Sequence, residues 1–327
     1  MNPIMNWAWI GSCVVAACST VYTSAVHAGE PALPPRLQAQ LQGILAASGT
    51  ESATVLMVDA LGVSGALQYG TNNCLPACAG PGPDALVALL AMRLTEQGKL
   101  NLHAPLQPAD AVSKRCKTRL TLSHYLEHTS APAGRCPGTQ TGYRDADHKQ
   151  SAAVLEKITH TSMTALMHRE LFNPLGMTAS QWKLPSPERT TANLPGHFLT
   201  TTPKDMAQLV QMMVQRGQID GRTYLPPCAV ERMGISVSAV SRPGGSVEQA
   251  AAKAKYGLGL ERFNAGGLSW LGLSGTLPGA RWVWGYSSAT KSGMVIQAPG
   301  ANAATLAALA SALAEHLRRD AVWSTQR

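Results

Sequence analysis

The sequence predicts a mixed α/β (α+β) fold in which one antiparallel sheet is assembled from both ends of the chain. Strand-like segments occur at residues 53–69 and again at residues 256–297, whereas residues from about 100 to 250 show mostly helical patterns between Pro- and Gly-containing loops. Helical patterns also lie near both ends. The economical arrangement is a single sheet covered by the terminal helices, with the mostly helical region inserted between its second and third strands. We therefore expect one domain over residues 29–327.

The N-terminal third supplies a helix, a hairpin and a second helix. Apolar residues at helical spacing predict a first helix that ends near Ala47. Two apolar runs joined by a Gly-containing turn, at residues 53–59 and 64–69, predict a hairpin. After a loop rich in Pro, Gly and Cys, Asp84 is a good N-cap for a helix that Gly98 ends.

The remaining elements follow from the spacing of apolar residues. Helices are expected at residues 121–128, 151–158, 163–171 and 204–215. Strands are expected at residues 256–263, 268–273, 281–286 and 293–297. A last helix over residues 301–319 carries basic residues in its final turn, where the helix dipole favours them.

The composition excludes several classes of protein. With 327 residues, 45% of them hydrophobic, the chain can bury a sizeable core, so disorder, coiled coil and collagen are excluded. The net charge is +8, but the basic residues are scattered apart from a cluster at residues 114–119. We therefore expect no nucleic-acid partner. No motif indicates a cofactor, and no feature indicates an oligomeric state.

Residues 1–28 are predicted to be an export signal. An apolar run at residues 7–17 is too short to span a bilayer as a stable helix and is followed by small residues. The sequence Val-His-Ala at residues 26–28 suits ordinary signal cleavage, whereas Val-Ala-Ala-Cys at residues 15–18 resembles the lipobox of bacterial lipoproteins. The first alternative predicts a periplasmic protein. The second predicts an outer-membrane lipoprotein that is attached to the membrane only through a lipidated Cys18.

Removal of this leader leaves an odd number of cysteines in an oxidising compartment. Cys116 and Cys136, which flank a loop, are the preferred disulfide. Cys74 and Cys78 could form a second, smaller one, which leaves Cys228 unpaired. Zinc binding is the alternative for such pairs, but no companion Cys or His pair lies at zinc-finger spacing.

Several stretches, in order along residues 50–290, carry a family resemblance. They include Leu-Thr-Glu-Gln-Gly-Lys-Leu-Asn-Leu at 94–102, His-Thr-Ser at 128–130, Pro-Gly-Thr at 137–139, Leu-Phe-Asn-Pro-Leu-Gly-Met at 171–177 and Tyr-Gly-Leu-Gly at 256–259. In this order they resemble the penicillin-recognising serine hydrolases, specifically the class C beta-lactamase, esterase and D-aminopeptidase group. The resemblance implies the beta-lactamase/transpeptidase-like fold.

The resemblance also implies a Ser nucleophile and, three residues later, a Lys at the start of the helix that ends at Gly98. Backbone N–H groups and the helix dipole stabilise negative charge there. Counting back from Gly98 places Pro81 at the Ser position and Asp84 at the Lys position. Pro has no nucleophilic atom, and a carboxylate reverses the charge of an ammonium group.

The other two elements of the family site are altered as well. The family's Tyr-x-Asn falls on Tyr143 and Asp145, so the Tyr is kept and the Asn is replaced. The family's basic residue-x-Gly falls on residues 273–275, which keeps Ser274 and Gly275 as oxyanion-side positions but loses the basic residue. We therefore expect a vestigial cleft, formed by Pro81, Asp84, Tyr143, Asp145, Ser274 and Gly275, in a catalytically degenerate protein.

Two alternatives concern reactive groups. A shift of three residues in the loop places Cys78 at the Ser position, and a thiolate at a helix N-terminus is a good nucleophile. The protein is then an active hydrolase on beta-lactam, ester or D-amino-acid peptide substrates. His-x-x-Glu-His at residues 124–128 matches an inverted zinc-protease pattern. No third ligand is identifiable, so we interpret His128 as a structural residue at a helix end and expect no metal.

The sequence as a whole predicts an exported pseudoenzyme in the bacterial cell envelope. It would act as a binding or scaffold module whose cleft holds a peptidoglycan-like or other envelope ligand.

Overall fold

A computed structural model describes most of the chain after residue 28. The described residues are 29–71, 77–78, 82–106, 116, 118–131, 135–140, 142, 144–183, 198–235, 238–240, 254–277 and 280–324. The proposed export signal, with Cys18 and both processing sites, lies outside them. No helix within these ranges has the length and apolarity needed to cross a membrane.

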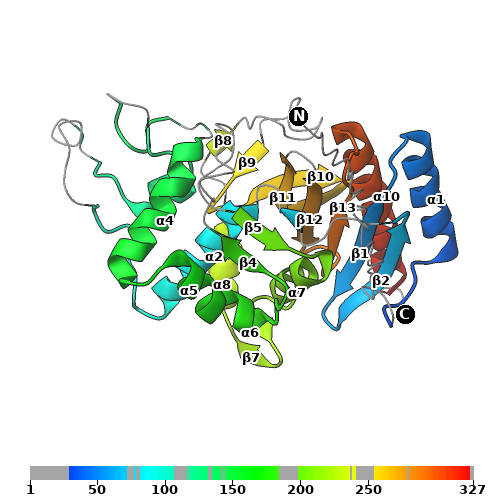
Figure 1. Cartoon of the computed structure of the whole chain (residues 1–327), viewed down its shortest axis with the longest axis horizontal. Coiled ribbons are helices and arrows are strands. Elements are labelled where there is room, and N and C mark those ends of the chain that lie inside the picture. The colour runs from blue at the N-terminus through cyan, green and yellow to red at the C-terminus, as the bar shows by residue number, and fades with distance from the viewer. Residues whose placement is uncertain are drawn as a thin grey trace, which may run out of the picture.

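The main feature is an eight-stranded sheet that joins the two ends of the chain (Figure 1). Its order is β2 (Gly62–Tyr69), β1 (Ala53–Asp59), β13 (Ser292–Gln297), β12 (Ala280–Ser287), β11 (Leu268–Leu277), β10 (Glu261–Ala265), β9 (Ala254–Tyr256) and β8 (Ser238–Val240). Neighbouring strands are antiparallel throughout. The N-terminal β1 pairs with the C-terminal β13, where Leu56 lies opposite Val295. The predicted sheet built from both ends of the chain is confirmed.

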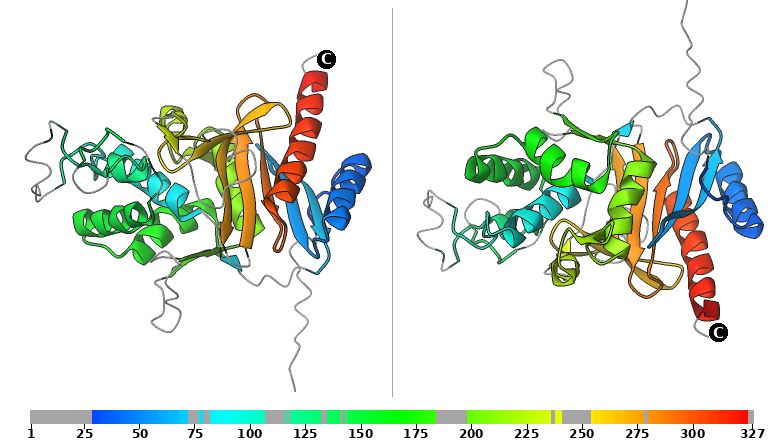
Figure 2. Two further views of the ribbon diagram at one scale, coloured as in Figure 1. Left: turned by 90° about the horizontal axis from the view of Figure 1, so that it is seen from above. Right: turned by 90° about the horizontal axis from the view of Figure 1, so that it is seen from below.

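Both faces of this sheet are covered, which explains why β1 is almost wholly apolar. Val55 and Met57 pack into the core beneath α1 (Pro35–Ala47) and α10 (Ala303–Ser324). Leu56 and Val58 point the other way, into the core that contains α7 (Pro203–Val214). Figure 2 shows α1 and α10 on one face of the sheet and the helices of the middle of the chain on the other. The predicted cover of terminal helices is therefore confirmed.

The middle of the chain forms the mostly helical side of the molecule. Its helices are α2 (Gly82–Glu96), α3 (Leu122–Leu126), α4 (Asp145–Thr159), α5 (Met163–Met167), the π-helical turn η1 (His168–Phe172), α6 (Asn173–Leu175), α7 and α8 (Pro227–Met233). At the centre lies α2, and its Leu86, Leu90 and Leu94 have no exposed surface. Such a helix is apolar on more than one side because other elements enclose it.

Short strands that the sequence did not predict complete this side. A three-stranded sheet has the order β3 (Ala77–Cys78), β5 (Phe198–Thr201), β4 (Gln181–Lys183), and β6 (Gln218–Ile219) pairs with β7 (Arg222–Thr223). Strands of two to four residues are too short to show the alternation on which prediction rests.

Several predicted boundaries are wrong. The strand expected at residues 268–273 continues to Leu277 as β11, and the last helix extends to Ser324, so the basic residues expected in its final turn lie inside it. Three further differences bear on the site. The strand expected at residues 256–263 is interrupted between β9 and β10, because Gly259 has a φ of +69° and turns the chain. Helix α4 begins at Asp145 rather than near Ser151, since its first turn is polar and carries no apolar period. Helix α2 begins at Gly82, so Asp84 lies inside the first turn and is not the N-cap.

Candidate functional site

Asp84 is a buried carboxylate in the first turn of α2, at the place where the family resemblance expects a Lys. The turn at Gly259 packs closely against this part of α2. A β-carbon on Gly259 would lie 2.7 Å from the backbone oxygen of Asp84, so only glycine permits the approach. The position of Asp84 is thus set by close packing of α2 on the β9–β10 turn.

The carboxylate of Asp84 contacts an imidazole from another helix. His148 lies in the first turn of α4, and its Nδ1 contacts Oδ1 of Asp84. The two side chains are only 14% and 7% exposed, respectively. At the Lys position of the family, this chain therefore has a carboxylate that is already engaged by a histidine.

A second histidine–carboxylate pair lies beside the first. His128, just after α3, is 1% exposed, and its Nδ1 lies 3.3 Å from Oδ2 of Asp147, which precedes His148 in α4. Ser130 donates a hydrogen bond of 2.6 Å to Oδ1 of Asp147, and Arg144 donates one of 3.0 Å to the Ser130 hydroxyl. Both oxygens of the buried Asp147 thus have polar partners.

The two pairs meet at a small cavity. The rings of His128 and His148 are 5.1 Å apart and nearly perpendicular. Ligand atoms of Asp84, His128 and His148 all lie within 4.8 Å of one another. The three residues line a cavity with a volume of about 10 Å³, together with Val87, Tyr125, Leu126 and Ser151. A volume of this size holds about one water molecule or one ion.

The expected vestigial cleft is described only in part. Ser274 is buried in β11 opposite Val283, and Gly275 follows it opposite Trp282. Asp145 is the first residue of α4. Pro81, Tyr143 and Cys74 lie outside the described residues.

Cys78, the alternative nucleophile, lies in β3, where it pairs with Thr200 of β5. It is therefore not part of the first turn of α2, whose dipole and N–H groups would activate a thiolate.

His124 and His128 of the His-x-x-Glu-His motif have different partners. The Thr121 N–H donates to Nδ1 of His124 at 3.1 Å, and the Thr121 hydroxyl lies 2.7 Å from the same atom, so His124 takes part in capping α3. Burial, together with the charge of nearby His103, lowers the pKa of His124. His128 is a buried helix-end residue, as expected, but its partner Asp147 was not predicted. The two histidines of the zinc-protease motif thus have separate partners, Thr121 for His124 and Asp147 for His128.

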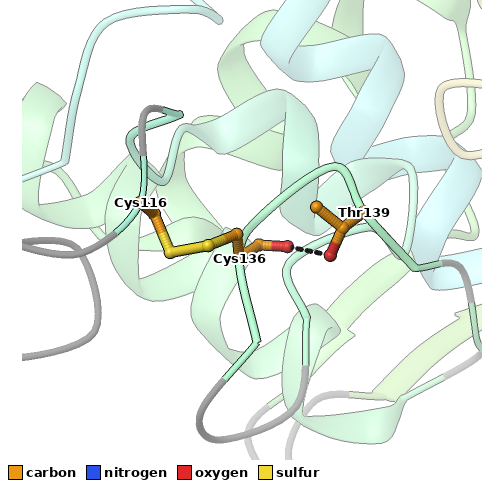
Figure 3. Close-up of a disulfide and its surroundings, with 3 residues drawn as sticks. All are labelled: Cys116, Cys136 and Thr139. Atoms are coloured by element: carbon orange, nitrogen blue, oxygen red, sulfur yellow. Dashed lines mark hydrogen bonds between the residues drawn. A yellow bond between two sulfur atoms is a disulfide. The ribbon is translucent and has the colours of Figure 1, made fainter.

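The disulfide expected between Cys116 and Cys136 is present, with a Cα–Cα distance of 5.5 Å (Figure 3). The Thr139 hydroxyl donates a hydrogen bond of 2.6 Å to the Cys136 carbonyl oxygen, which fixes the turn beside the bridge. Cys228, expected to be unpaired, is an exposed free thiol in α8.

The fold and the position of α2 define a class of protein, the serine beta-lactamase and transpeptidase type, in which a nucleophile helix packs against an antiparallel sheet. The Beta-lactamase family model matches residues 85–317, more than two thirds of the chain. The chain belongs to the Beta-lactamase family. The match begins one residue after Asp84, so it does not include the Ser and Lys positions.

Solved structures support the same fold. An octameric penicillin-binding protein homologue from Pyrococcus abyssi has a TM-score of 0.67 at 18% identity, over 85% of this chain and 76% of that one. The D-alanine carboxypeptidase AmpC from Burkholderia cenocepacia has a TM-score of 0.65 at 16% identity, over 86% and 97%. D-amino acid amidase from Ochrobactrum anthropi SV3 has a TM-score of 0.65 at 14% identity, over 86% and 99%. No curated protein matches the chain.

Proposed function

We propose that this chain is a Beta-lactamase family member that does not form the family's acyl-enzyme and acts instead as a binding or scaffold module. The observation that carries the proposal is the buried Asp84 in the first turn of α2, engaged by His148. A carboxylate at the Lys position cannot supply the positive charge that lowers the barrier to deprotonation of a Ser.

The other Ser-x-x-Lys spacings in the sequence do not replace the nucleophile and its base. Ser-x-x-Lys spacing occurs at residues 180–183 and 288–291. Ser180 is buried and donates its hydroxyl hydrogen bond to Asp205. Ser288 lies between β12 and β13, far from any helix N-terminus in sequence. Neither serine itself lies in the first turn of a helix, where its own backbone N–H groups could stabilise a developing oxyanion.

The proposed setting is the bacterial cell envelope, and the proposed ligand is peptidoglycan-like. The predicted leader at residues 1–28 and the disulfide between Cys116 and Cys136 both favour an exported protein. The solved relatives include a D-alanine carboxypeptidase and a D-amino acid amidase, so peptides that contain D-amino acids are the first ligands to try.

The second candidate is an active hydrolase with an unrecognised nucleophile, and the enzymes among the structural relatives favour it. A covalent probe separates the two. The purified mature protein is incubated with a fluorescent penicillin and, separately, with a fluorophosphonate, and its intact mass is measured. An active class C beta-lactamase serves as the positive control.

We expect no adduct on the native protein. An adduct that maps to residues 74–84 overturns the proposal, and its loss in Cys78→Ala would identify the thiol. The double variant Pro81→Ser/Asp84→Lys restores the family spacing. If only this variant is labelled, the native protein forms no adduct because it lacks the Ser and the Lys, and not because its cleft is inaccessible.

A further inference from the structure

Three potential metal ligands converge from three separate parts of the helical side. Asp84 comes from α2, His128 from the segment after α3, and His148 from α4. Their ligand atoms lie within 4.8 Å of one another, which is somewhat wider than the spacing of ligands around one zinc-class ion. Small side-chain movements would complete the site, and the direct contact between Asp84 and His148 would open to admit the ion. No sequence motif unites these residues, since each comes from a different element.

The donor set selects a class of metal. Two imidazole nitrogens and one carboxylate oxygen suit Zn²⁺ and related divalent transition metals, whereas Mg²⁺ and Ca²⁺ prefer oxygen ligands only. We propose that Asp84, His128 and His148 form a binding site for one divalent transition-metal ion of the zinc class. The proposal goes beyond the proposed function, because it requires no ligand in the cleft.

The surroundings of His128 support this assignment. Metal-binding imidazoles usually donate their second N–H to a carboxylate, which fixes the ring orientation and the tautomer. Asp147 takes this position at Nδ1 of His128, so the proposal assigns Nε2 as the coordinating nitrogen. Ser130 and Arg144 in turn hold Asp147. The network has the two layers that an oriented metal site needs.

Charge and volume agree with an ion as the occupant. Two buried carboxylates, Asp84 and Asp147, balance the charge of one divalent cation when both imidazoles are neutral. The cavity of about 10 Å³ accepts an ion but not a substrate group. We therefore infer a site that links α2, α4 and the segment after α3, rather than one that presents the metal to a substrate.

The competing arrangement has no metal. Each histidine would then be protonated and would balance its own carboxylate in one of two adjacent ion pairs. This arrangement predicts no stoichiometric metal and no gain in melting temperature when metal is added.

The test uses the mature chain without an affinity tag, because a histidine tag binds the same metals. The protein is treated with a chelator, dialysed, and loaded with Zn²⁺ or with Co²⁺. Bound metal is counted by elemental analysis, the visible absorption of Co²⁺ reports coordination by the protein, and the melting temperature is recorded with and without metal.

We expect one equivalent of metal per chain, an intense Co²⁺ spectrum and a higher melting temperature with metal. Asp84→Asn and His148→Gln each should lose all three signals. Asp147→Asn should keep the site but lower its affinity about 10- to 100-fold, as removal of such an orienting carboxylate does elsewhere. This graded effect would not follow from a merely structural role.

Two matched controls separate the site from nonspecific effects. Asp205→Asn removes another buried carboxylate in the first turn of a helix, and His316→Gln removes a histidine that pairs with Asp320. Both should bind metal as the native chain does. Binding below one equivalent in the native chain, or equal binding by Asp84→Asn and His148→Gln, overturns the proposal. If Asp84→Asn does not fold, His148→Gln decides. The result leaves the acyl-probe experiment unaffected, so the two proposals fail separately.

Discussion

Two helices of this molecule begin with similar residues, but the aspartates in their first turns have different partners. Helix α2 opens with Gly82, Pro83 and Asp84, and helix α7 with Pro203, Lys204 and Asp205. In both, a proline near the start suits the first turn and an aspartate follows it in a favourable position for the helix dipole. Both aspartates are buried.

The partners of the two aspartates differ in kind. Asp205 accepts hydrogen bonds from the Ala179 N–H at 2.9 Å and the Ser180 hydroxyl at 2.7 Å, while Thr202 caps the helix. Asp84 pairs with His148 and lies close to His128. The difference shows that a local sequence sets where a helix starts, whereas distant residues decide what chemistry its first turn carries.

The largest effect is expected from Gly259→Ala, which disturbs the start of α2 without removing any polar group. Its β-carbon would lie 2.7 Å from the Asp84 backbone oxygen, and the φ of +69° strains any other residue. Overpacking and strain together should lower the free energy of unfolding by about 2–4 kcal/mol. Urea denaturation followed by circular dichroism measures it.

Gly293, which packs against α7, provides the matched control. A β-carbon on Gly293 would overlap Cγ1 of Val210 in α7. Gly293 is not among the glycines with a positive φ, so the substitution adds crowding without backbone strain. Gly293→Ala should cost about 1–3 kcal/mol and leave metal binding unchanged. Gly259→Ala should also weaken metal binding, because it shifts Asp84. Equal metal affinity in the two variants would mean that the first turn of α2 does not need its present position.

Asp205→Asn should have the next largest effect. The Ala179 N–H and the Ser180 hydroxyl both donate to Oδ2 of Asp205, so a single amide oxygen can still accept from them, but without the negative charge that strengthens both bonds. The expected cost is about 1.5–3 kcal/mol near neutral pH.

The pH dependence gives Asp205→Asn a second readout. Burial raises the pKa of Asp205, although hydrogen bonds from Ser180, Ala179 and Thr202 oppose this shift. A carboxyl group with a raised pKa in the folded state loses stability as pH rises from its unfolded pKa to its folded pKa. The disadvantage of the variant should therefore be greatest below that interval and smaller above it. A constant difference across the titration would contradict the raised pKa.

The sequence predicted the fold well because its signals are local or lie in a fixed order. The apolar runs of β1 and β13 and the ordered family motifs are readable along the chain, and they predict the sheet. The start of α4 was missed because the first turn of this helix is polar.

The wrong start of α4 also prevented prediction of the Asp84–His128–His148 cluster. Asp147 and His148 come into the first turn of α4 only when the helix begins at Asp145. Their partners, His128 and Asp84, lie in other elements, and side-chain pairing between elements has no period in the sequence. The one signal available was Asp84 at the position where the family has a Lys. It predicted a change of chemistry but did not identify His148 as the partner of Asp84.

A smaller effect is expected at the cap of α7. The Thr202 hydroxyl accepts a hydrogen bond of 3.1 Å from the Asp205 N–H. Thr202→Ala should lower the free energy of unfolding by about 1 kcal/mol. Thr202→Ser keeps the hydroxyl and should restore most of it. A cost shared equally by Ala and Ser would show that the methyl group, and not the cap, matters.

The smallest effect concerns the far end of α2 and appears only in acid. Burial by itself would raise the pKa of Glu170, but hydrogen bonds from Gln97 and Arg169 and the charge of Lys99 more than offset it, so the pKa lies below its usual 4.5. A carboxyl group with a lowered pKa in the folded state adds stability above its unfolded pKa and loses it as pH falls through its folded pKa. The gain is modest because Lys99 and Arg169 are more than half exposed.

Glu170→Gln cannot ionise, so the native chain should exceed it in stability at neutral pH, and this advantage should disappear below pH 4.5. Urea midpoints of both proteins across a pH series measure the difference, and raised salt should reduce it. Because Gln97 lies just after α2, the contact holds the end of that helix opposite Asp84. If Glu170→Gln instead lowers stability equally at every pH, the Glu170 side chain contributes through packing and not through its charge.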